Sequence, residues 1–215
     1  MLTINNDFFN DMLKLLQENK IEEFKKVQRE RNLDINSINK KGQTFLFSAL
    51  LKKPVAEFLV KEGINIHHVD INGRNALFYS SIPVMKILLN KGINVNQVDN
   101  DGNNYLLARP RLLTKENTRM LHKHGIDMNH VNNRGENVLF FLLTNPYIFE
   151  LCAKLGTEHK VTNKNGVLLS DLIFENSQLM EKYNGLDEFK AIRDKNILLR
   201  NFAKEEFVER AKNRI

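Results

Sequence analysis

Residues 63–78, which read GINIHHVDINGRNALF, decide the fold of this chain. The same pattern returns at residues 92–107 (GINVNQVDNDGNNYLL) and at residues 125–140 (GIDMNHVNNRGENVLF). A weaker copy, LDINSINKKGQTFLF, occupies residues 33–47, and another occupies residues 156–169. A unit that recurs at intervals of about 30 residues is typical of a solenoid of stacked modules rather than of a single closed core.

Each unit contains two glycines with different expected roles. The first, such as Gly63, follows an apolar helical run, where glycine fits the left-handed residue that ends a helix. The second, such as Gly73, follows a cluster of Asp and Asn residues, which turn the backbone tightly. These turn glycines stand 29 to 33 residues apart, at Gly42, Gly73, Gly102, Gly135 and Gly166. We therefore expect each unit to contain a turn, a short inner helix, a second helix, a glycine stop and an extended finger.

Two further positions identify the inner helix. A residue that can cap a helix stands two places after each turn glycine, at Thr44, Asn75, Asn104 and Asn137. Its side chain can accept a hydrogen bond from the first free amides of that helix. A leucine that we expect to face inward follows two places later, at Leu46, Leu77, Leu106 and Leu139. One unit cannot bury its apolar stripe alone, so we expect neighbouring units to stack.

This spacing resembles that of the ankyrin repeat family. The resemblance is carried by DINGRNAL at residues 70–77 and ILLNKGINVN at residues 87–96, and it covers residues 33–166. The family patterns are D-x-x-G-x-T-P-L-H-x-A and V-x-x-L-L-x-x-G-A-D-x-N. This chain departs from them, because Thr-Phe, Asn-Ala, Asn-Tyr or Asn-Val replaces Thr-Pro. The resemblance implies an all-α repeat solenoid of stacked helix pairs, with short β-hairpin-like fingers and helical caps at both ends.

We expect three segments along the chain. Residues 1–32 are predicted to form an N-terminal helical cap, or degenerate first repeat. Residues 33–185 are predicted to form the repeat array, and residues 186–215 a C-terminal capping helix with apolar residues four apart. In the N-terminal segment one helix face carries Phe9, Met12, Leu13 and Leu16. Asn19, with Glu22 three residues later, resembles a capping arrangement that opens a second helix.

Composition and charge limit the cellular compartments and the classes of partner that we expect for this protein. Charged residues make up 27% of the chain and hydrophobic residues 42%, which suits a folded, soluble protein. No apolar run approaches the ~20 residues that span a membrane, and the N-terminus lacks the pattern of a secretory signal. The net charge of +6 is spread along the chain without an aromatic-interleaved basic groove. We expect a cytoplasmic monomer, or one delivered into a host cell, that binds neither nucleic acid nor membrane.

The histidines and the single cysteine raise the question of a metal or catalytic site. His67 and His68 are adjacent and His122 and His124 are two apart, whereas a helical metal pair usually needs i, i+4 spacing. Cys152 stands where other units have leucine, which indicates a buried small hydrophobe. No Gly-x-Ser-x-Gly motif, phosphate loop or paired-carboxylate arrangement is present. We predict no metal, no cofactor, no catalytic residue and no enzymatic activity.

The finger tips and the inner face are the remaining candidates for function. The predicted protein-binding residues are Lys40, Lys41, Gln43, Ile71, Asn72, Arg74, Asn100, Asp101, Asn103, Arg109, Arg111, Asn133, Arg134 and Glu136. Arg109 and Arg111 flank Pro110 in the unit with the longest interval, where we expect an irregular loop. Ile71 differs from the rest, because an apolar residue in an otherwise polar turn has no evident folding reason. The alternative is that these tips are only polar turns.

These observations leave three functional hypotheses open. The resemblance implies a non-catalytic scaffold that binds another protein through a concave finger surface. A small array of this kind also suits an immunity or inhibitor protein for a cognate toxin or enzyme. The third hypothesis is the ankyrin module of a host-directed bacterial effector, because irregular repeat intervals resemble those of ankyrin modules in some bacterial effectors.

Overall fold

The computed structural model describes residues 2–48 and 50–175. The chain divides into two compact units, Met1–Asn133 and Arg134–Ile215, each of which is described by itself. The predicted C-terminal helix at residues 186–215 lies outside the described residues. The segment boundaries predicted after residues 32 and 185 therefore stay predictions.

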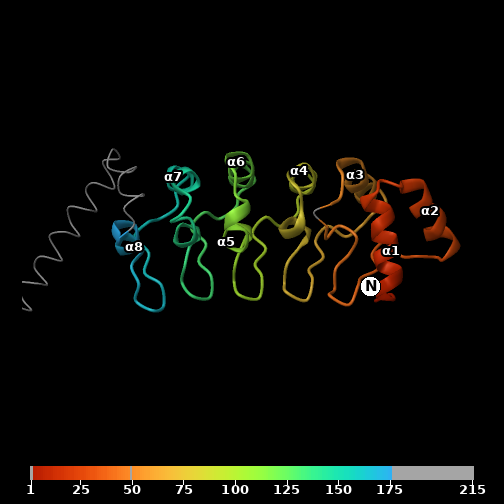
Figure 1. The fold of residues 1–215 in the computed structure, drawn as a ribbon, viewed down its shortest axis with the longest axis horizontal. Helices are drawn as coiled ribbons and strands as arrows, with labels where there is room; N and C mark the ends of the chain where they lie inside the picture. The colour runs from red at the N-terminus through yellow and green to blue at the C-terminus, as the bar shows by residue number, and fades with distance from the viewer. Residues whose placement is uncertain (1, 49, 176–215) are drawn as a thin grey trace, which may run out of the picture. The chain divides into compact units, whose positions relative to one another are not determined.

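The first unit consists of helices joined by long loops. Two α-helices open it, α1 (Asn6–Gln17) and α2 (Ile21–Glu30). Three longer helices then alternate with short ones, in the order α3 (Lys53–Lys61), η1 (Ala76–Tyr79), α4 (Ile82–Asn90), α5 (Tyr105–Ala108), η2 (Pro110–Leu112) and α6 (Lys115–Lys123). In Figure 1 the outer helices α3, α4 and α6 lie in a row, and the loops project on the opposite side. We call these loops the fingers.

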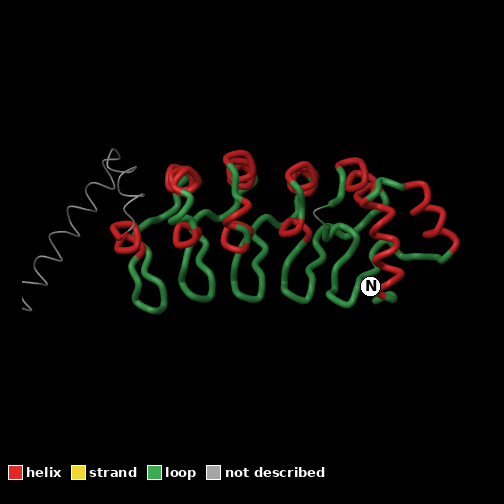
Figure 2. Tube along the Cα trace, in the orientation of Figure 1, coloured by secondary structure: helices red, strands yellow, loops and turns green. Residues whose placement is uncertain are grey.

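The second unit repeats the same arrangement. It contains η3 (Val138–Phe141), α7 (Pro146–Lys154) and α8 (Leu169–Glu175). Figure 2 draws its fingers, like those of the first unit, as loops. In the described part of the chain the fingers carry only isolated bridges, and those within a finger, Val69 with Asn75 and Thr162 with Leu168, are antiparallel. The predicted all-α repeat solenoid with hairpin-like fingers is confirmed.

The outer helices begin and end where the sequence rules place them. Prolines occupy the first turn of α3, α4 and α7, where a missing backbone amide costs nothing. The residues that follow these helices and α6 have positive φ angles of +80° to +95°, at Gly63, Gly92, Gly125 and Gly156. Asn19 (φ 64°) and Asn32 (φ 48°) take the same role after α1 and α2, since asparagine tolerates this conformation.

Two predicted helix caps are wrong. Asn19 does not open α2: the helix begins after Lys20, which makes no side-chain capping bond, and Asn19 instead ends α1. Thr44 does not open an inner helix either. Residues 45–46 form a turn, and the buried Thr44 hydroxyl has no hydrogen-bond partner.

The remaining inner helices are capped by asparagine as predicted. The side chains of Asn75 and Asn137 accept hydrogen bonds from the amides two residues ahead, and that of Asn104 accepts one from the amide three residues ahead. The same side chains also donate to the backbone carbonyls of Asn94, Glu158 and Asp127, respectively. Asparagine therefore caps a helix and binds the following finger at once. Thr44 makes neither contact, because its hydroxyl has no hydrogen-bond partner.

The core is built from the leucines and aromatic residues that the repeat predicted. The inward leucines, Leu46, Leu77, Leu106 and Leu139, have no exposed surface. In the N-terminal part, Phe45 stacks on Phe9 with ring centroids 4.5 Å apart and meets Phe24 edge-on at 5.4 Å. These rings join α1 and α2 to the first finger-bearing repeat.

The N-terminal segment pairs with the first finger. Thr3 forms a parallel bridge with Ile38. The Ile38 amide donates to the Leu2 carbonyl, and the Ile4 amide donates to the Ile38 carbonyl, each at 3.1 Å. Residues 2–4 therefore occupy the side of the first finger where later fingers have a neighbour.

Gly102→Ala is expected to destabilise the first unit more than Gly92→Ala. Both glycines have positive φ angles, +76° and +80°, and this conformation costs an alanine about 1–2 kcal/mol. Only at Gly102 would the added carbon also lie 2.5 Å from the Asn133 side-chain oxygen, whereas nothing lies within 4 Å at Gly92. Urea unfolding of both variants measures the difference. Equal losses in the free energy of unfolding would show that the finger tip rearranges around the added carbon at no energetic cost.

Candidate functional site

Four of the fingers are shaped by the carboxylate or amide that opens them, three residues before the turn glycine. Asp70 Oδ1 accepts hydrogen bonds from the amides of Asn72 (2.9 Å) and Arg74 (3.1 Å). The same oxygen of Asp99 accepts from the amides two and four residues ahead, at 3.1 and 2.9 Å. Asn39 and Asn163 do the same with their side-chain oxygens. One side chain therefore holds each of these four turns in a fixed conformation.

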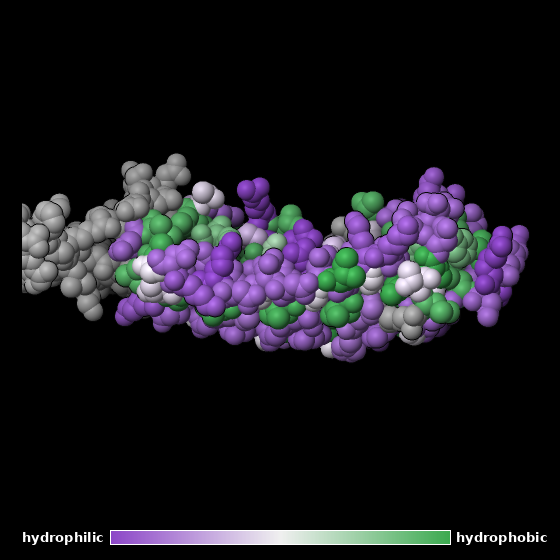
Figure 3. All heavy atoms as spheres, turned by 90° about the horizontal axis from the view of Figure 1, so that it is seen from below, coloured by the Kyte–Doolittle hydropathy of each residue, from purple (hydrophilic) through white to green (hydrophobic). Residues whose placement is uncertain are grey.

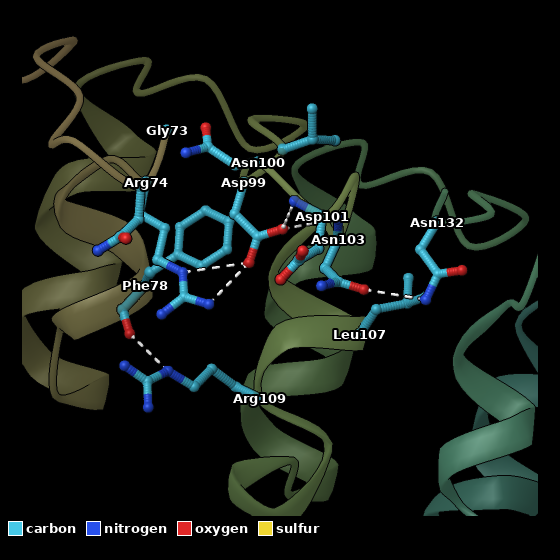
Figure 4. A network of polar contacts seen from close by, with 12 residues as sticks. Gly73, Arg74, Phe78, Asp99, Asn100, Asp101, Asn103, Leu107, Arg109 and Asn132 are labelled. Carbon is cyan, nitrogen blue, oxygen red and sulfur yellow. Dashed lines mark hydrogen bonds and ion pairs between the residues drawn. The ribbon is translucent and has the colours of Figure 1, made fainter. Parts of the chain in front are cut away.

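The residue after each turn glycine binds the opening residue of the next finger. These inter-finger pairs are Gln43–Asp70, Arg74–Asp99, Asn103–Asn132 and Glu136–Asn163. Figure 4 shows two of them, with Arg74 reaching across to Asp99 and Asn132 reaching back to Asn103. We call this set the finger ladder. It ties each of these fingers to its neighbour within the same unit.

The strongest rung is the ion pair of Arg74 and Asp99. Arg74 donates to Asp99 Oδ2 from Nη2 at 2.7 Å and from Nε at 3.2 Å. The Asp99 side chain is 2% exposed and that of Arg74 is 28% exposed. Burial lowers the pKa of Arg74, but the contacts with Asp99 and Tyr79 outweigh burial and raise it overall. Burial also raises the pKa of Tyr79, and its hydroxyl donates to Asp70 Oδ2 at 2.7 Å.

The finger tips are joined by backbone hydrogen bonds. The Ile71 amide donates to the Lys41 carbonyl at 3.1 Å, and the Asn100 amide donates to the Asn72 carbonyl at 2.9 Å. The Asn133 amide meets the Asp101 carbonyl in the same way, at 3.1 Å. In the second unit the Lys164 amide donates to the Arg134 carbonyl at 2.9 Å. The tips are therefore held in register as well as individually shaped.

A third set of contacts was not predicted from the sequence. The side chains of His68, Gln97 and His130 each meet the carbonyl of the preceding turn glycine, at 2.6, 2.8 and 2.6 Å. All three stand five residues after a stop glycine, so their recurrence in the repeat was a usable signal. His68 and His130 thus have a structural contact. No cluster of three or more potential metal ligands occurs among residues 2–48 and 50–175.

The structure separates the predicted binding residues into two groups. The half-buried group contacts neighbouring repeats or fingers and comprises Gln43, Arg74, Asn103, Arg109 and Glu136. The exposed group comprises Lys40, Lys41, Ile71, Asn72, Asn100, Asp101, Arg111, Asn133 and Arg134. The first group contributes to the stability of the array. The second group presents the finger surface to solvent, and within it Asn100 and Asn133 also donate to the preceding finger. The role of this group in binding stays a prediction.

Arg109 precedes a short helix and Arg111 lies within it, where the sequence predicted an irregular loop. Residues Pro110–Leu112 form the 3-10 helix η2, so the expected loop is wrong. Arg109 Nε donates to the Phe78 carbonyl at 3.1 Å, as Figure 4 shows, and its guanidinium lies 5.6 Å from the centre of the Tyr79 ring. Arg109 therefore bridges two inner helices, and Arg111 is exposed.

Cys152 has the environment of a core residue, as predicted. It has no exposed surface, and burial raises the pKa of its thiol to about 12. At pH 8 roughly one thiol in 10⁴ would be ionised, and only the thiolate attacks disulfide reagents.

Cys152 is therefore expected to resist a thiol reagent in the folded protein and to react fully in urea. It is the chain's single cysteine, so the signal is unambiguous. The measurement is the rate of thionitrobenzoate release with and without denaturant. Fast reaction of the folded protein would mean that the second unit opens readily around α7.

Helix pairs, left-handed stop residues and laddered fingers together define a helical repeat protein. A family model described as ankyrin repeats in three copies matches residues 1–99. Residues 1–99 are therefore identified as ankyrin repeats. The match includes the N-terminal helices α1 and α2. No match was found among the curated proteins, and no helix in the described residues is long and apolar enough to cross a membrane.

Two solved structures share the fold. One is a chain of the complex between the predatory endopeptidase Bd0816 of Bdellovibrio bacteriovorus and the immunity protein Bd3460. It is 20% identical, with a TM-score of 0.68 over 86% of this chain and 97% of that chain. The other is an ankyrin repeat domain from Acinetobacter baumannii AYE, 19% identical, with a TM-score of 0.63 over 80% of this chain and 94% of that chain.

Proposed function

We propose that this protein is a non-catalytic scaffold that binds a partner protein through its finger surface. The observation that carries the proposal is the finger ladder. Because side-chain and backbone hydrogen bonds already fix the fingers, little conformational entropy is lost when a partner binds. Ankyrin repeats suggest protein–protein interaction, and the exposed tips are the part of this fold that the ladder holds in place and leaves accessible.

Affinity purification from the native lysate, followed by mass spectrometry, tests the proposal. The bait is compared with a variant in which Lys41→Glu and Asp101→Lys invert two exposed tip charges. The matched control inverts Lys26 and Glu30 on the outer face of α2, where both are exposed. A partner that is lost only with the tip variant supports the proposal. A partner that is retained by the tip variant and lost with the α2 variant would show that the binding surface lies at α2 and not at the finger tips.

A second candidate function is an immunity or inhibitor protein for a cognate enzyme or toxin. It is favoured by the similar solved chain, which comes from a complex of an endopeptidase with an immunity protein. Co-expression with an enzyme encoded beside this protein's gene is the direct test. Rescue of growth that depends on the finger surface would support it, and unchanged toxicity would count against it.

We also propose that the protein acts as a cytoplasmic monomer. Light scattering tests the oligomeric state, and cell fractionation tests the compartment.

A further inference from the structure

Ile71 differs from the residues that hold the same position in the third and fourth fingers. The residue two places before the turn glycine is Asn100 in the third finger and Asn133 in the fourth. Each side chain lies over the preceding turn, and its amide donates to the carbonyl of the equivalent residue one finger back, at 3.0 Å to Ile71 and 3.2 Å to Asn100. Ile71 holds this position in the second finger and has no side-chain donor. The side-chain link to the first finger is therefore missing at this position, and only the bond from the Ile71 amide to the Lys41 carbonyl remains.

Ile71 gains little packing in return. Its Cγ2 atom lies 3.3 Å from the place that a Cβ of residue 42 would occupy, so it touches the turn at Gly42. The side chain is nevertheless 64% exposed. A residue that lacks the inter-finger hydrogen bond made by Asn100 and Asn133 and that exposes apolar surface breaks a local folding rule. Such exceptions concentrate at functional sites.

The surroundings of Ile71 are positively charged. Its amide is bonded to the carbonyl of Lys41, so the two residues are direct neighbours across the first and second fingers. Lys40, Lys41 and Asn72 are exposed, whereas the neighbouring Asp70 is 5% exposed and its carboxylate is occupied by backbone amides, Gln43 and Tyr79. Seen from the finger side, Figure 3 shows a largely hydrophilic surface with separate hydrophobic spots. We call Lys40, Lys41, Ile71 and Asn72 the Ile71 tip site.

We propose that the Ile71 tip site binds a segment of a partner protein that presents an apolar side chain beside carboxylates. This inference rests on the proposed scaffold function and adds the chemistry of the partner. Covering Ile71 removes exposed apolar surface from water, and the lysines supply complementary charge to the flanking carboxylates. Because Lys40 and Lys41 are exposed, binding weakens as the salt concentration rises.

Selection from a random-peptide phage library on the immobilised full chain tests this proposal. The expected peptides combine Leu, Ile or Phe with neighbouring Asp or Glu. A synthetic peptide from the selection is expected to lose about tenfold in affinity with Ile71→Asn and with Lys40→Glu/Lys41→Glu. The matched control is Leu50→Asn, which changes an equally exposed apolar residue (68%) outside the fingers and should leave affinity unchanged.

Ile71→Asn has a second expected effect that separates binding from folding. The new asparagine can donate to the Lys40 carbonyl one finger back, just as Asn100 and Asn133 donate to the carbonyls one finger back from them. The melting temperature should therefore stay equal or rise while the affinity for the peptide falls. Failure to select any peptide, selection of peptides without acidic residues, equal binding by Ile71→Asn, or an equal loss with Leu50→Asn would each overturn the assignment. A partner protein bound equally well by Ile71→Asn would leave the scaffold proposal intact and reject only this site.

Discussion

Phe45→Ala is expected to lower the free energy of unfolding by about 3–5 kcal/mol, the usual cost of removing a buried aromatic ring. Phe45 has no exposed surface, stacks on Phe9 at 4.5 Å and meets Phe24 edge-on at 5.4 Å. The substitution therefore removes buried apolar area and the two aromatic contacts that join α1 and α2 to the first repeat. Urea unfolding followed by circular dichroism measures the loss.

Phe8→Ala is the matched control, because Phe8 is half-buried on the same helix as Phe9. We expect it to cost less than half as much, since the ring is only partly removed from water. If both substitutions cost the same, the Phe9–Phe45–Phe24 cluster does not hold the N-terminal helices in place. A separate early transition in Phe45→Ala would instead show that α1 and α2 detach before the rest of the first unit unfolds.

Asp99→Ala is expected to cost about 2–4 kcal/mol, because one substitution removes the acceptor of three donor residues. The amides of Asp101 and Asn103 lose the oxygen that shapes the third finger, and the Arg74 guanidinium loses its partner. Arg74 is 28% exposed and can turn partly to water, which keeps the expected cost below that of a fully buried pair. Chemical unfolding of the purified variant gives the value.

Two control variants separate the contribution of the turn hydrogen bonds from that of the ion pair with Arg74. Asp99→Asn keeps an oxygen for the turn amides, as Asn163 does in its own finger, and loses only the ion pair. It should cost less than Asp99→Ala. Asp101→Ala changes an exposed residue of the same finger and should cost almost nothing. An Asp99→Ala protein as stable as Asp101→Ala would show that the ladder does not stabilise the array.

The elements predicted correctly from sequence obey local rules. Proline in the first turn of α4 and glycine after its end need no knowledge of the rest of the chain. The inward leucines follow from repeat spacing, and their burial is complete. Asn19 shows the limit of such rules: it fits both a helix opening and a left-handed stop, and the short connection between α1 and α2 required the stop.

The candidate site was harder to predict, because its contacts join residues 25 to 29 positions apart. Arg74 and Asn103 looked like free finger residues, yet each binds the residue that opens the next finger. Aligned repeats carry the signal, since the residue after one turn glycine always complements the opening residue of the next finger. Thr44 shows a related limit, because its residue type suits a helix cap, yet its hydroxyl makes no hydrogen bond in the structure.

The pairing of residues 2–4 with Ile38 has a practical consequence for anyone handling this protein. Backbone groups left open at the end of a stack of modules are a template on which a second molecule can continue the row, head to tail. Here the chain's own start covers that edge at the first finger. We expect a purification tag fused directly before residue 2 to compete with residues 2–4 for Ile38 and so to favour head-to-tail association into filaments. A tag is therefore better placed elsewhere or behind a flexible spacer.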